Sequence, residues 1–334
     1  MRLGLLAAML LLGTHVAVAG LDPAAVRKAA SYSARHRGRS VLVIQNGKTI
    51  FEDYSGRATA DTPMRIYSGT KAFWNLAALA AAEDRILNLD ERVADTIVSW
   101  RKDRRKSQVT IRQLLDFSCG LAPGFGLQVN EYGNRDKTAL ALPMVAEPGK
   151  SFIYGPSALQ VFHAVLKEKL HGKRPTDYLE RRILRPMHLG SQRYLKDRAG
   201  NPLLAAGFIM TARQWAKMGE LVLREGKPVL RPGSLAQSWQ GSPANRAFSL
   251  GWWNNRAAPH GREFDFEEML EPGWSHQDWH NACLCREAPG DLVACIGSGY
   301  QRLYVIPSLN LIVVRQGAGG KFSDGHFLRL LLGK

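Results

Sequence analysis

The chain has 334 residues, of which 45% are hydrophobic and 22% are charged, and its formal net charge is +16. This composition is that of a globular protein with an ample core, and it excludes a disordered or collagen-like chain. Basic proteins attract polyanions in general, but the sequence has no nucleic-acid-binding motif and no array of alternating basic and aromatic residues, so we expect no nucleic-acid partner.

Residues 1–19 have the three parts of a secretory signal peptide. Arg2 precedes an apolar run over 3–12, and Ala17-Val18-Ala19 matches a cleavage site of small residues. The apolar run is too short to span a bilayer. We expect cleavage before Gly20, a periplasmic or secreted protein without stable membrane insertion, and one domain over 20–334. The positive charge indicates in the first place a generally basic surface, and an electrostatic association with anionic envelope polymers is the alternative to it. An uncleaved anchor is the alternative to a cleaved signal peptide.

The hydrophobic pattern predicts helices in the middle of the chain and strands at its two ends. A helix over 22–36 precedes a hairpin whose strands, 41–44 and 48–51, flank the turn Gln45-Asn46-Gly47. Further helices are expected over 72–82, 109–115, 157–170, 176–183, 211–223 and 324–332, and further strands over 248–253, 291–296, 301–306 and 309–315. This order predicts an α+β fold, in which N- and C-terminal strands form one antiparallel sheet flanked by helices and an all-helical lobe is inserted.

Ser68 and Lys71 form a Ser-x-x-Lys motif where the apolar helix over 72–82 begins. Positions i and i+3 share one face of a helix, so the two side chains can meet. Burial disfavours the charged amine and lowers its pKa, which lets Lys71 take the proton of the Ser68 hydroxyl and make it a nucleophile. The helix N-terminus supplies N–H groups where an oxyanion would develop. The alternative interpretation of Ser68 is a plain helix cap.

A second Ser-x-x-Lys pattern occurs at Ser99-Trp100-Arg101-Lys102. It continues into the charge run 101–106, which we expect to be a solvated loop. A hydrated lysine stays protonated and cannot act as a base, so only the Ser68 motif is expected to carry chemistry.

Four further segments show a resemblance to a known family. Segments 111–121, 148–154, 211–216 and 297–307 read IRQLLDFSCGL, PGKSFIY, TARQWA and GSGYQRLYVIP. Together with Ser-x-x-Lys they are similar to motifs of the serine β-lactamase/penicillin-binding-protein superfamily. The nearest branch holds class C β-lactamases, D-aminopeptidases, carboxylesterases and 6-aminohexanoate-dimer hydrolases. The resemblance extends from about residue 40 to the end and implies a β-lactamase/transpeptidase-like fold, with the site between the sheet and the helical lobe.

The resemblance also implies an acyl-enzyme mechanism that needs no cofactor and no metal. Ser68 would be the nucleophile and Lys71 its base. Tyr154 ends the PGKSFIY segment and resembles the family tyrosine that protonates the leaving group and activates water; ordinary packing is the alternative. The oxyanion hole would combine the Ser68 N–H with an N–H at Gly299 or Tyr300.

The proposed substrate-binding edge, formed by Gly297, Ser298, Gly299 and Tyr300, departs from the family pattern. Gly297-Ser298-Gly299 stands where the family usually has Lys-Thr-Gly, and Tyr154-Gly155-Pro156 stands where it has Tyr-x-Asn. A cation and an amide that contact β-lactam or peptide substrates are therefore missing, although Arg302 is an alternative cation nearby.

These departures favour an exported serine hydrolase that cleaves ester or amide bonds of a small-molecule or peptide-like acyl substrate. One alternative is a cell-wall D-alanyl peptidase or weak β-lactamase. Another is a non-catalytic penicillin-binding-like envelope protein.

Four cysteines, Cys119, Cys283, Cys285 and Cys295, occur in the chain. An oxidising compartment permits disulfides, but four cysteines allow three pairings. One bridge is expected among the last three, and Cys119 is expected to be a free, buried thiol.

A second cluster, His276, His280, Cys283 and Cys285, offers imidazole and thiolate groups that suit zinc. The Cys-x-Cys spacing is shorter than in zinc sites, so we expect no metal there. We expect this loop to border the cleft together with Trp252 and Trp253, which could equally belong to the core.

Overall fold

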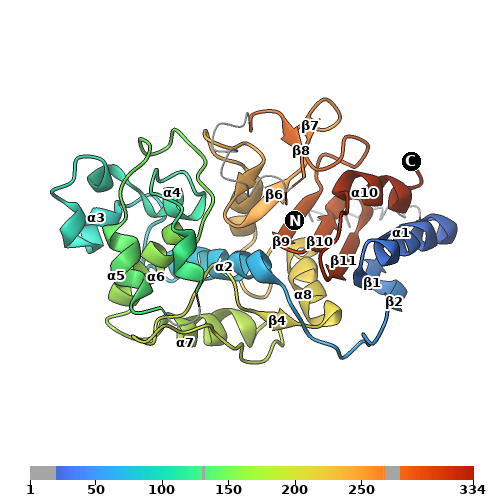
Figure 1. Cartoon of the computed structure of the whole chain (residues 1–334), viewed down its shortest axis with the longest axis horizontal. Helices are drawn as coiled ribbons and strands as arrows, with labels where there is room; N and C mark the ends of the chain where they lie inside the picture. Colours follow the sequence, from blue (N-terminus) through green and yellow to red (C-terminus); the bar gives the residue numbers. More distant parts are fainter. Residues whose placement is uncertain (1–19, 130–131, 266, 268–278) are drawn as a thin grey trace, which may run out of the picture.

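An antiparallel sheet of seven strands joins the two ends of the chain in the computed structural model, which describes residues 20–129, 132–265, 267 and 279–334 (Figure 1). The strand order is β2-β1-β11-β10-β9-β6-β5, and every neighbouring pair is antiparallel. The strands are β1 (Gly38–Gln45), β2 (Lys48–Tyr54), β5 (Phe248–Ser249), β6 (Trp252–Asn254), β9 (Val293–Gly297), β10 (Gln301–Ile306) and β11 (Leu311–Gly317). This confirms the predicted sheet of N- and C-terminal strands. The predicted signal peptide lies outside the described residues.

Helices cover both faces of the sheet. Successive side chains of a strand point to opposite sides, and in β9, β10 and β11 the residues on both sides are buried. On one face Tyr304 of β10 stacks on Phe327 of α10 (Asp324–Leu332), and α1 (Pro23–Arg35) lies beside α10 (Figure 1). On the other face α8 (Ala212–Leu223) packs so closely that a Cβ on its Gly219 would lie 2.6 Å from Ile312 of β11. The central strands β9, β10 and β11 are therefore buried on both sides.

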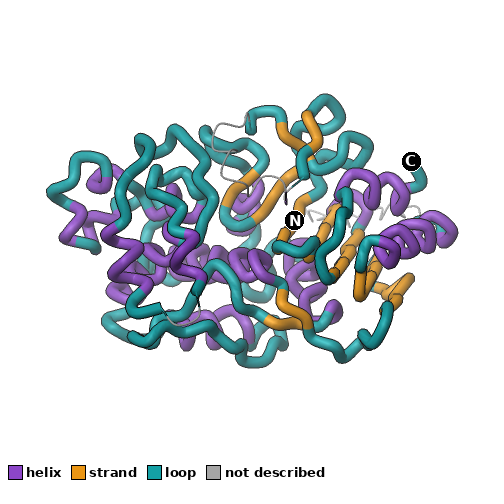
Figure 2. Tube along the Cα trace, in the orientation of Figure 1, coloured by secondary structure: helices purple, strands orange, loops and turns teal. Residues whose placement is uncertain are grey.

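The other half of the molecule consists of helices and loops, whereas nearly all strands gather beside it (Figure 2). Its helices are α3 (Val93–Thr96), α4 (Ile111–Leu115), α5 (Arg135–Ala141), α6 (Ser157–Lys169) and α7 (Pro175–Leu179), which continues as a π-helical turn over Glu180–Leu184. Thr110 and Gln113 form a capping box at the start of α4. None of the described helices combines the length and hydrophobicity needed to cross a membrane.

Helix α2 (Thr70–Glu83) lies between the sheet and the helical lobe (Figure 1). Its residues from Thr70 to Ala81 are all buried, and the apolar side chains among them belong to one continuous hydrophobic core with the sheet and the lobe. A helix that is apolar on all sides is expected in such a central position. Its N-terminus, preceded by the 3-10 turn η1 (Tyr67–Gly69), opens toward the end of β9.

The strand expected over 248–253 is instead the tight hairpin β5–β6. Leu250 and Gly251 between the strands have positive φ angles of 43° and 83°. The Leu250 N–H donates to Asp116 Oδ1, and a Cβ on Gly251 would lie 2.6 Å from Asn75 Nδ2. Contacts with the lobe and α2 thus fold this segment into two strands.

Four strands of two residues each were not predicted, because so short a segment has no readable periodicity. They form two separate pairs: β3 (Met64–Arg65) with β4 (Ile209–Met210), and β7 (Arg262–Glu263) with β8 (Ala282–Cys283).

Candidate active site

Ser68 and Lys71 meet where η1 passes into α2. Lys71 Nζ donates to Ser68 Oγ at 2.8 Å and to the Ala205 carbonyl oxygen at 2.9 Å. The N-cap of α2 is Gly69, and no side chain caps this helix end. The interpretation of Ser68 as a plain helix cap is therefore wrong, and its hydroxyl is held by the buried amine.

Burial makes Lys71 an unusual lysine. Its residue is only 4% exposed. Desolvation lowers the pKa of its ammonium group to about 7, and the nearby Cys295 thiol opposes this shift only weakly. A substantial fraction of the amine is therefore neutral at physiological pH and can accept a proton from the serine hydroxyl against which it lies.

Tyr154 completes a group of three side chains around the serine. Its hydroxyl forms a hydrogen bond with Ser68, and its ring centroid lies 4.7 Å from Lys71 Nζ. Burial raises the pKa of the phenol, and the bond with Ser68 only partly offsets this. The ring packs edge-on against Phe117 with centroids 4.9 Å apart. Tyr154 is thus protonated at neutral pH and held in place to donate a proton.

A pocket of about 240 Å³ opens over these three groups. Tyr67 and Phe125 contribute to its lining and remain 40% and 46% exposed, which gives the pocket mouth an apolar character. The described residues that line it are Tyr67, Ser68, Lys71, Phe125, Gln128, Tyr154, Gly155, Pro156, Ala205, Ala206 and Ser298. The structure therefore brings Ser298 of the predicted edge together with Ser68, Lys71 and Tyr154.

Gly297 explains why the edge lacks the usual lysine. This glycine ends β9, and a Cβ at its position would lie 2.0 Å from the carbonyl oxygen of Ile66, two residues before the serine. No side chain fits there without moving the segment that carries Ser68. Gly299 and Tyr300, with φ angles of 70° and 59°, then turn the chain into β10.

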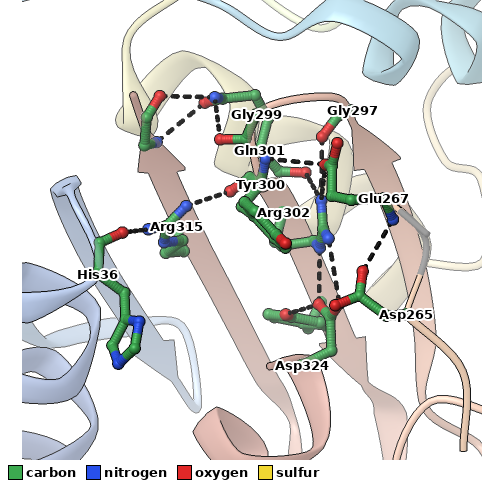
Figure 3. Close-up of polar contacts among 12 residues, drawn as sticks. His36, Asp265, Glu267, Gly297, Gly299, Tyr300, Gln301, Arg302, Arg315 and Asp324 are labelled. Carbon is green, nitrogen blue, oxygen red and sulfur yellow. Dashed lines mark hydrogen bonds and ion pairs between the residues drawn. The ribbon is translucent and has the colours of Figure 1, made fainter. Parts of the chain in front are cut away.

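The backbone N–H of Tyr300 is not free to bind an oxyanion in this structure. It donates to Glu267 Oε1 at 3.0 Å (Figure 3). The Glu267 carboxylate also lies 3.7 Å from Arg302 Nη1 and close enough to Tyr154 to raise the pKa of its phenol. This contact corrects the expectation of an open oxyanion donor at Tyr300, because the donor is available only when Glu267 releases it.

Arg302 does not supply the missing substrate-binding cation. Its side chain is completely buried on the sheet face that α10 covers, where Nε and Nη2 bind the two oxygens of Asp324 at 2.6 and 3.1 Å (Figure 3). Tyr304 also donates to this carboxylate. Arg302 is a structural cation, and the alternative role considered for it is wrong.

Several residues of the site could not be found from the sequence. Ala205 fixes Lys71 through a backbone carbonyl, and such a contact leaves no trace in residue type. Phe125 and Gln128 reach the pocket from the 3-10 turn Phe125–Gln128, which has no recognisable motif. Glu267 is one of many acidic residues, and only its position marks it.

Trp252 and Trp253 belong to the core rather than to the pocket. They are 0% and 1% exposed, and Trp253 packs against Phe248 and Phe264. The expectation that these rings border the cleft is therefore wrong, and the core alternative holds. His276 lies outside the described residues.

All four cysteines are buried free thiols, so the expected bridge among Cys283, Cys285 and Cys295 is absent. Burial raises the pKa of Cys119 to about 11 and that of Cys295 to about 12, which keeps both protonated. Within the described residues, the ligand atoms of Cys285, Glu263 and Glu287 lie within 4.8 Å of one another. Arg329 already pairs with both of these carboxylates, which accounts for their proximity without a metal.

The chain belongs to the Beta-lactamase family, whose model matches residues 24–316. Among solved structures it is similar to a penicillin-binding protein homologue from Pyrococcus abyssi, described as octameric, with 19% identity, a TM-score of 0.68, and coverage of 92% of this chain and 78% of that one. A family VIII carboxylesterase gives 16% identity and a TM-score of 0.66 over 94% and 98% of the two chains. A class C β-lactamase from Rhodobacter sphaeroides gives 17% and 0.65 over 93% and 99%. At these identities the likeness shows the fold.

Curated relatives share less of the chain. Protein flp of Staphylococcus aureus (strain COL) is 24% identical over 168 residues, which are 46% of this chain and 34% of that protein. The chain thus matches about a third of the length of this relative.

Proposed function

We propose that the protein is a serine hydrolase that forms an acyl-enzyme through Ser68 and cleaves ester or amide bonds. The observation that carries this proposal is the 2.8 Å contact between Ser68 Oγ and the amine of Lys71, a lysine whose burial lowers its pKa to about 7. Membership of the Beta-lactamase family and the fold shared with a carboxylesterase support it.

In the first half-reaction Ser68 Oγ attacks the carbonyl carbon of the substrate, and the serine proton passes to neutral Lys71 Nζ. Tyr154 donates its phenolic proton to the leaving alcohol or amine as the C–O or C–N bond breaks. The Lys71 ammonium then returns a proton to Tyr154. The net result is an acyl group on Ser68 and a neutral leaving group, with Lys71 and Tyr154 restored to their starting protonation states.

In the second half-reaction water attacks the acyl carbon and gives its proton to Lys71, either directly or through Tyr154. The bond between the acyl carbon and Ser68 Oγ breaks, the serine recovers the proton, and a carboxylic acid leaves. The Ser68 N–H, in the turn η1 that precedes α2, is one donor for the oxyanion. The second donor is the N–H of Gly299 or that of Tyr300, and the Tyr300 N–H becomes available once Glu267 has moved away.

The pocket favours short, uncharged acyl groups over β-lactams. Its volume is about 240 Å³ and its mouth carries Tyr67 and Phe125. A β-lactam or D-alanyl peptide brings a carboxylate that needs a cation, and Gly297 leaves no room for one. This distinguishes the proposed function from that of a D-alanyl peptidase or a β-lactamase.

Intact mass after reaction with a fluorophosphonate probe tests the proposal. One adduct on the wild type and none on Ser68→Ala would support an activated serine. Turnover of p-nitrophenyl acetate and butyrate without labelling by a fluorescent penicillin would support the ester and amide preference, whereas strong penicillin labelling would favour the peptidase alternative. Absence of an adduct on both proteins would overturn the catalytic proposal and leave the non-catalytic alternative.

We also propose that the protein is exported, on the pattern of residues 1–19 alone. N-terminal sequencing of the protein recovered from a periplasmic fraction should begin at Gly20. Recovery of protein that still begins at Met1 from the cytoplasm would contradict export.

A further inference from the structure

A second and larger cavity lies away from the proposed active site. Its volume is about 660 Å³, and it shares no described lining residue with the pocket over Ser68. Three segments form its walls, and its described lining residues are Gln240, Gly241, Ser242, Pro243, Arg246, Asn254, Arg256, Ala257, His280, Asn281 and Ala282. We call it the Arg246/Arg256 cavity.

The cavity lies at the opposite end of the central strands from Ser68. Asn254 of β6 pairs with Val293, the first residue of β9, whereas the proposed active site lies beyond Gly297 at the other end of β9. Four residues of extended strand span about 13 Å. A molecule bound in the cavity therefore does not compete with the acyl substrate for space.

The described part of the lining contains two cations, Arg246 and Arg256, together with the imidazole of His280. Neither Asp nor Glu is among the described residues that line the cavity. Both arginines are exposed, and within the described part of the chain neither pairs with a carboxylate. Two unpaired guanidinium groups in one concave site are suited to bind an oxyanion through paired N–H donors.

One buried side chain fixes the backbone of both arginines. Asn254 is 2% exposed, its Nδ2 donates to the Arg246 carbonyl oxygen at 2.8 Å, and its Oδ1 accepts the Arg256 N–H at 3.1 Å. The turn before Arg246 is tied as well, since the Ser242 N–H donates to the Asn245 carbonyl oxygen at 2.8 Å. The two cations are thus presented from a preorganised wall, which lowers the entropic cost of binding.

We propose that the Arg246/Arg256 cavity binds an organic anion that carries a phosphate group. The volume exceeds that of one phosphate and falls within the range of small-molecule sites. Gln240, Ser242 and Asn281 add neutral hydrogen-bonding groups for a polar moiety attached to the phosphate. The same chemistry fits a free sugar phosphate or the phosphate of an anionic envelope polymer. In the second case the net charge of +16 would attract the polymer, and the cavity would be the place where its phosphate binds.

Isothermal titration calorimetry at low salt tests this site on the whole protein. The probes are inorganic phosphate, glucose 6-phosphate, long-chain polyphosphate and, as a neutral control, glucose. The test variant is Arg246→Gln/Arg256→Gln. The matched control is Arg57→Gln/Arg193→Gln, which removes two exposed arginines that do not line the cavity.

We expect the wild type to bind glucose 6-phosphate saturably and not to bind glucose. The cavity variant should bind glucose 6-phosphate at least tenfold more weakly. The affinity of the control variant should change by at most a factor of two. Circular dichroism should show that both variants are folded, since all four arginines are exposed. If polyphosphate binds more tightly than glucose 6-phosphate and loses its affinity in the same variant, the ligand is a polymer. If glucose 6-phosphate binds more tightly, it is a small molecule. Absence of saturable binding of every phosphate probe, or equal loss in both variants, would overturn the proposal.

Discussion

Lys71 Nζ lies 2.8 Å from Ser68 Oγ in a position from which water is almost completely excluded. Among the described residues no carboxylate pairs with this amine, and desolvation by burial is the main cause that lowers its pKa to about 7, against the opposing effect of Cys295. A lysine that had a carboxylate partner would remain charged and could not act as a base. This relationship makes the charge state of Lys71 the main source of pH dependence expected for the site.

The pH profile of ester turnover should follow Lys71. The neutral amine is the base, so kcat/KM should rise as pH increases through about 7 and should fall about tenfold for each pH unit below that value. Initial rates with p-nitrophenyl acetate between pH 5 and pH 9, corrected for spontaneous hydrolysis, measure this. Lys71→Met should lose nearly all activity. An activity that still rises tenfold per unit up to pH 9 without levelling, as expected for an ordinary lysine, would contradict the assignment.

Tyr154→Phe should reduce turnover while it preserves the fold. The ring packs against Phe117 and keeps these contacts, whereas the hydroxyl that bonds to Ser68 is lost. Positioned acid–base groups contribute about 10²- to 10⁴-fold to rate, so kcat should fall by about 10² or more. Stopped-flow kinetics and intact mass should reveal whether the acyl-enzyme accumulates. A variant with wild-type kcat would leave Tyr154 as a packing residue.

Removal of Glu267 should increase activity toward neutral esters. Its carboxylate occupies the Tyr300 N–H, so Glu267→Ala frees a donor that can bind the oxyanion. Loss of one oxyanion-hole donor lowers kcat by about 10²- to 10³-fold in other enzymes. A donor that is freed in the variant should recover part of this factor, so we expect kcat to rise several-fold. Glu168→Ala removes one exposed charge on α6 and serves as the matched control. A decrease specific to Glu267→Ala would mean that Glu267 assists catalysis instead of blocking the donor.

The sequence was informative where periodicity or spacing determines structure. The turn at Asn46-Gly47 and the buried helix after Lys71 were readable because each depends on local pattern, and the pairing of terminal strands was inferred from the order of strands and helices along the chain. The contact of Lys71 with the Ala205 carbonyl and that of Tyr300 with Glu267 were not readable. Each of these contacts joins segments that are distant in sequence and uses a backbone group of one of them. Every residue has such a backbone group, so the residue type does not indicate the contact. The cavity at Arg246 and Arg256 arises in the same way from three separate segments.

The buried ion pair of Arg302 with Asp324 should stabilise the fold without serving catalysis directly. Both side chains are at most 1% exposed. Asp324→Ala removes the nearest carboxylate from the buried Arg302 charge and leaves that of Glu267, which lies 3.7 Å away. Removal of one partner of a buried ion pair costs about 3–5 kcal/mol in the free energy of unfolding. Urea denaturation followed by fluorescence measures it. Asp291→Ala, which removes an exposed carboxylate bound to Ser308, is the control and should cost much less.

The contribution of Asp116 to stability should fall as pH rises from about 4 to 6. This carboxyl is buried, accepts hydrogen bonds from Ser249 Oγ and the Leu250 N–H, and ties the helical lobe to the β5–β6 hairpin. Desolvation raises its pKa from 3.8 to about 6. The folded state therefore binds more protons than the unfolded state between these values, and the free energy of unfolding decreases as pH rises through this window.

Asp116→Asn isolates this contribution, because the amide oxygen can still accept both hydrogen bonds but carries no charge. The difference in unfolding free energy between the variant and the wild type should change steadily from pH 4 to pH 6 and stay constant above about pH 7. Each unit of pKa displacement corresponds to about 1.4 kcal/mol, which urea titrations at half-unit pH steps resolve. If the difference in unfolding free energy does not vary with pH, the pKa of Asp116 is the same in the folded and unfolded states. Burial of its carboxylate against Leu250 would then not destabilise the fold.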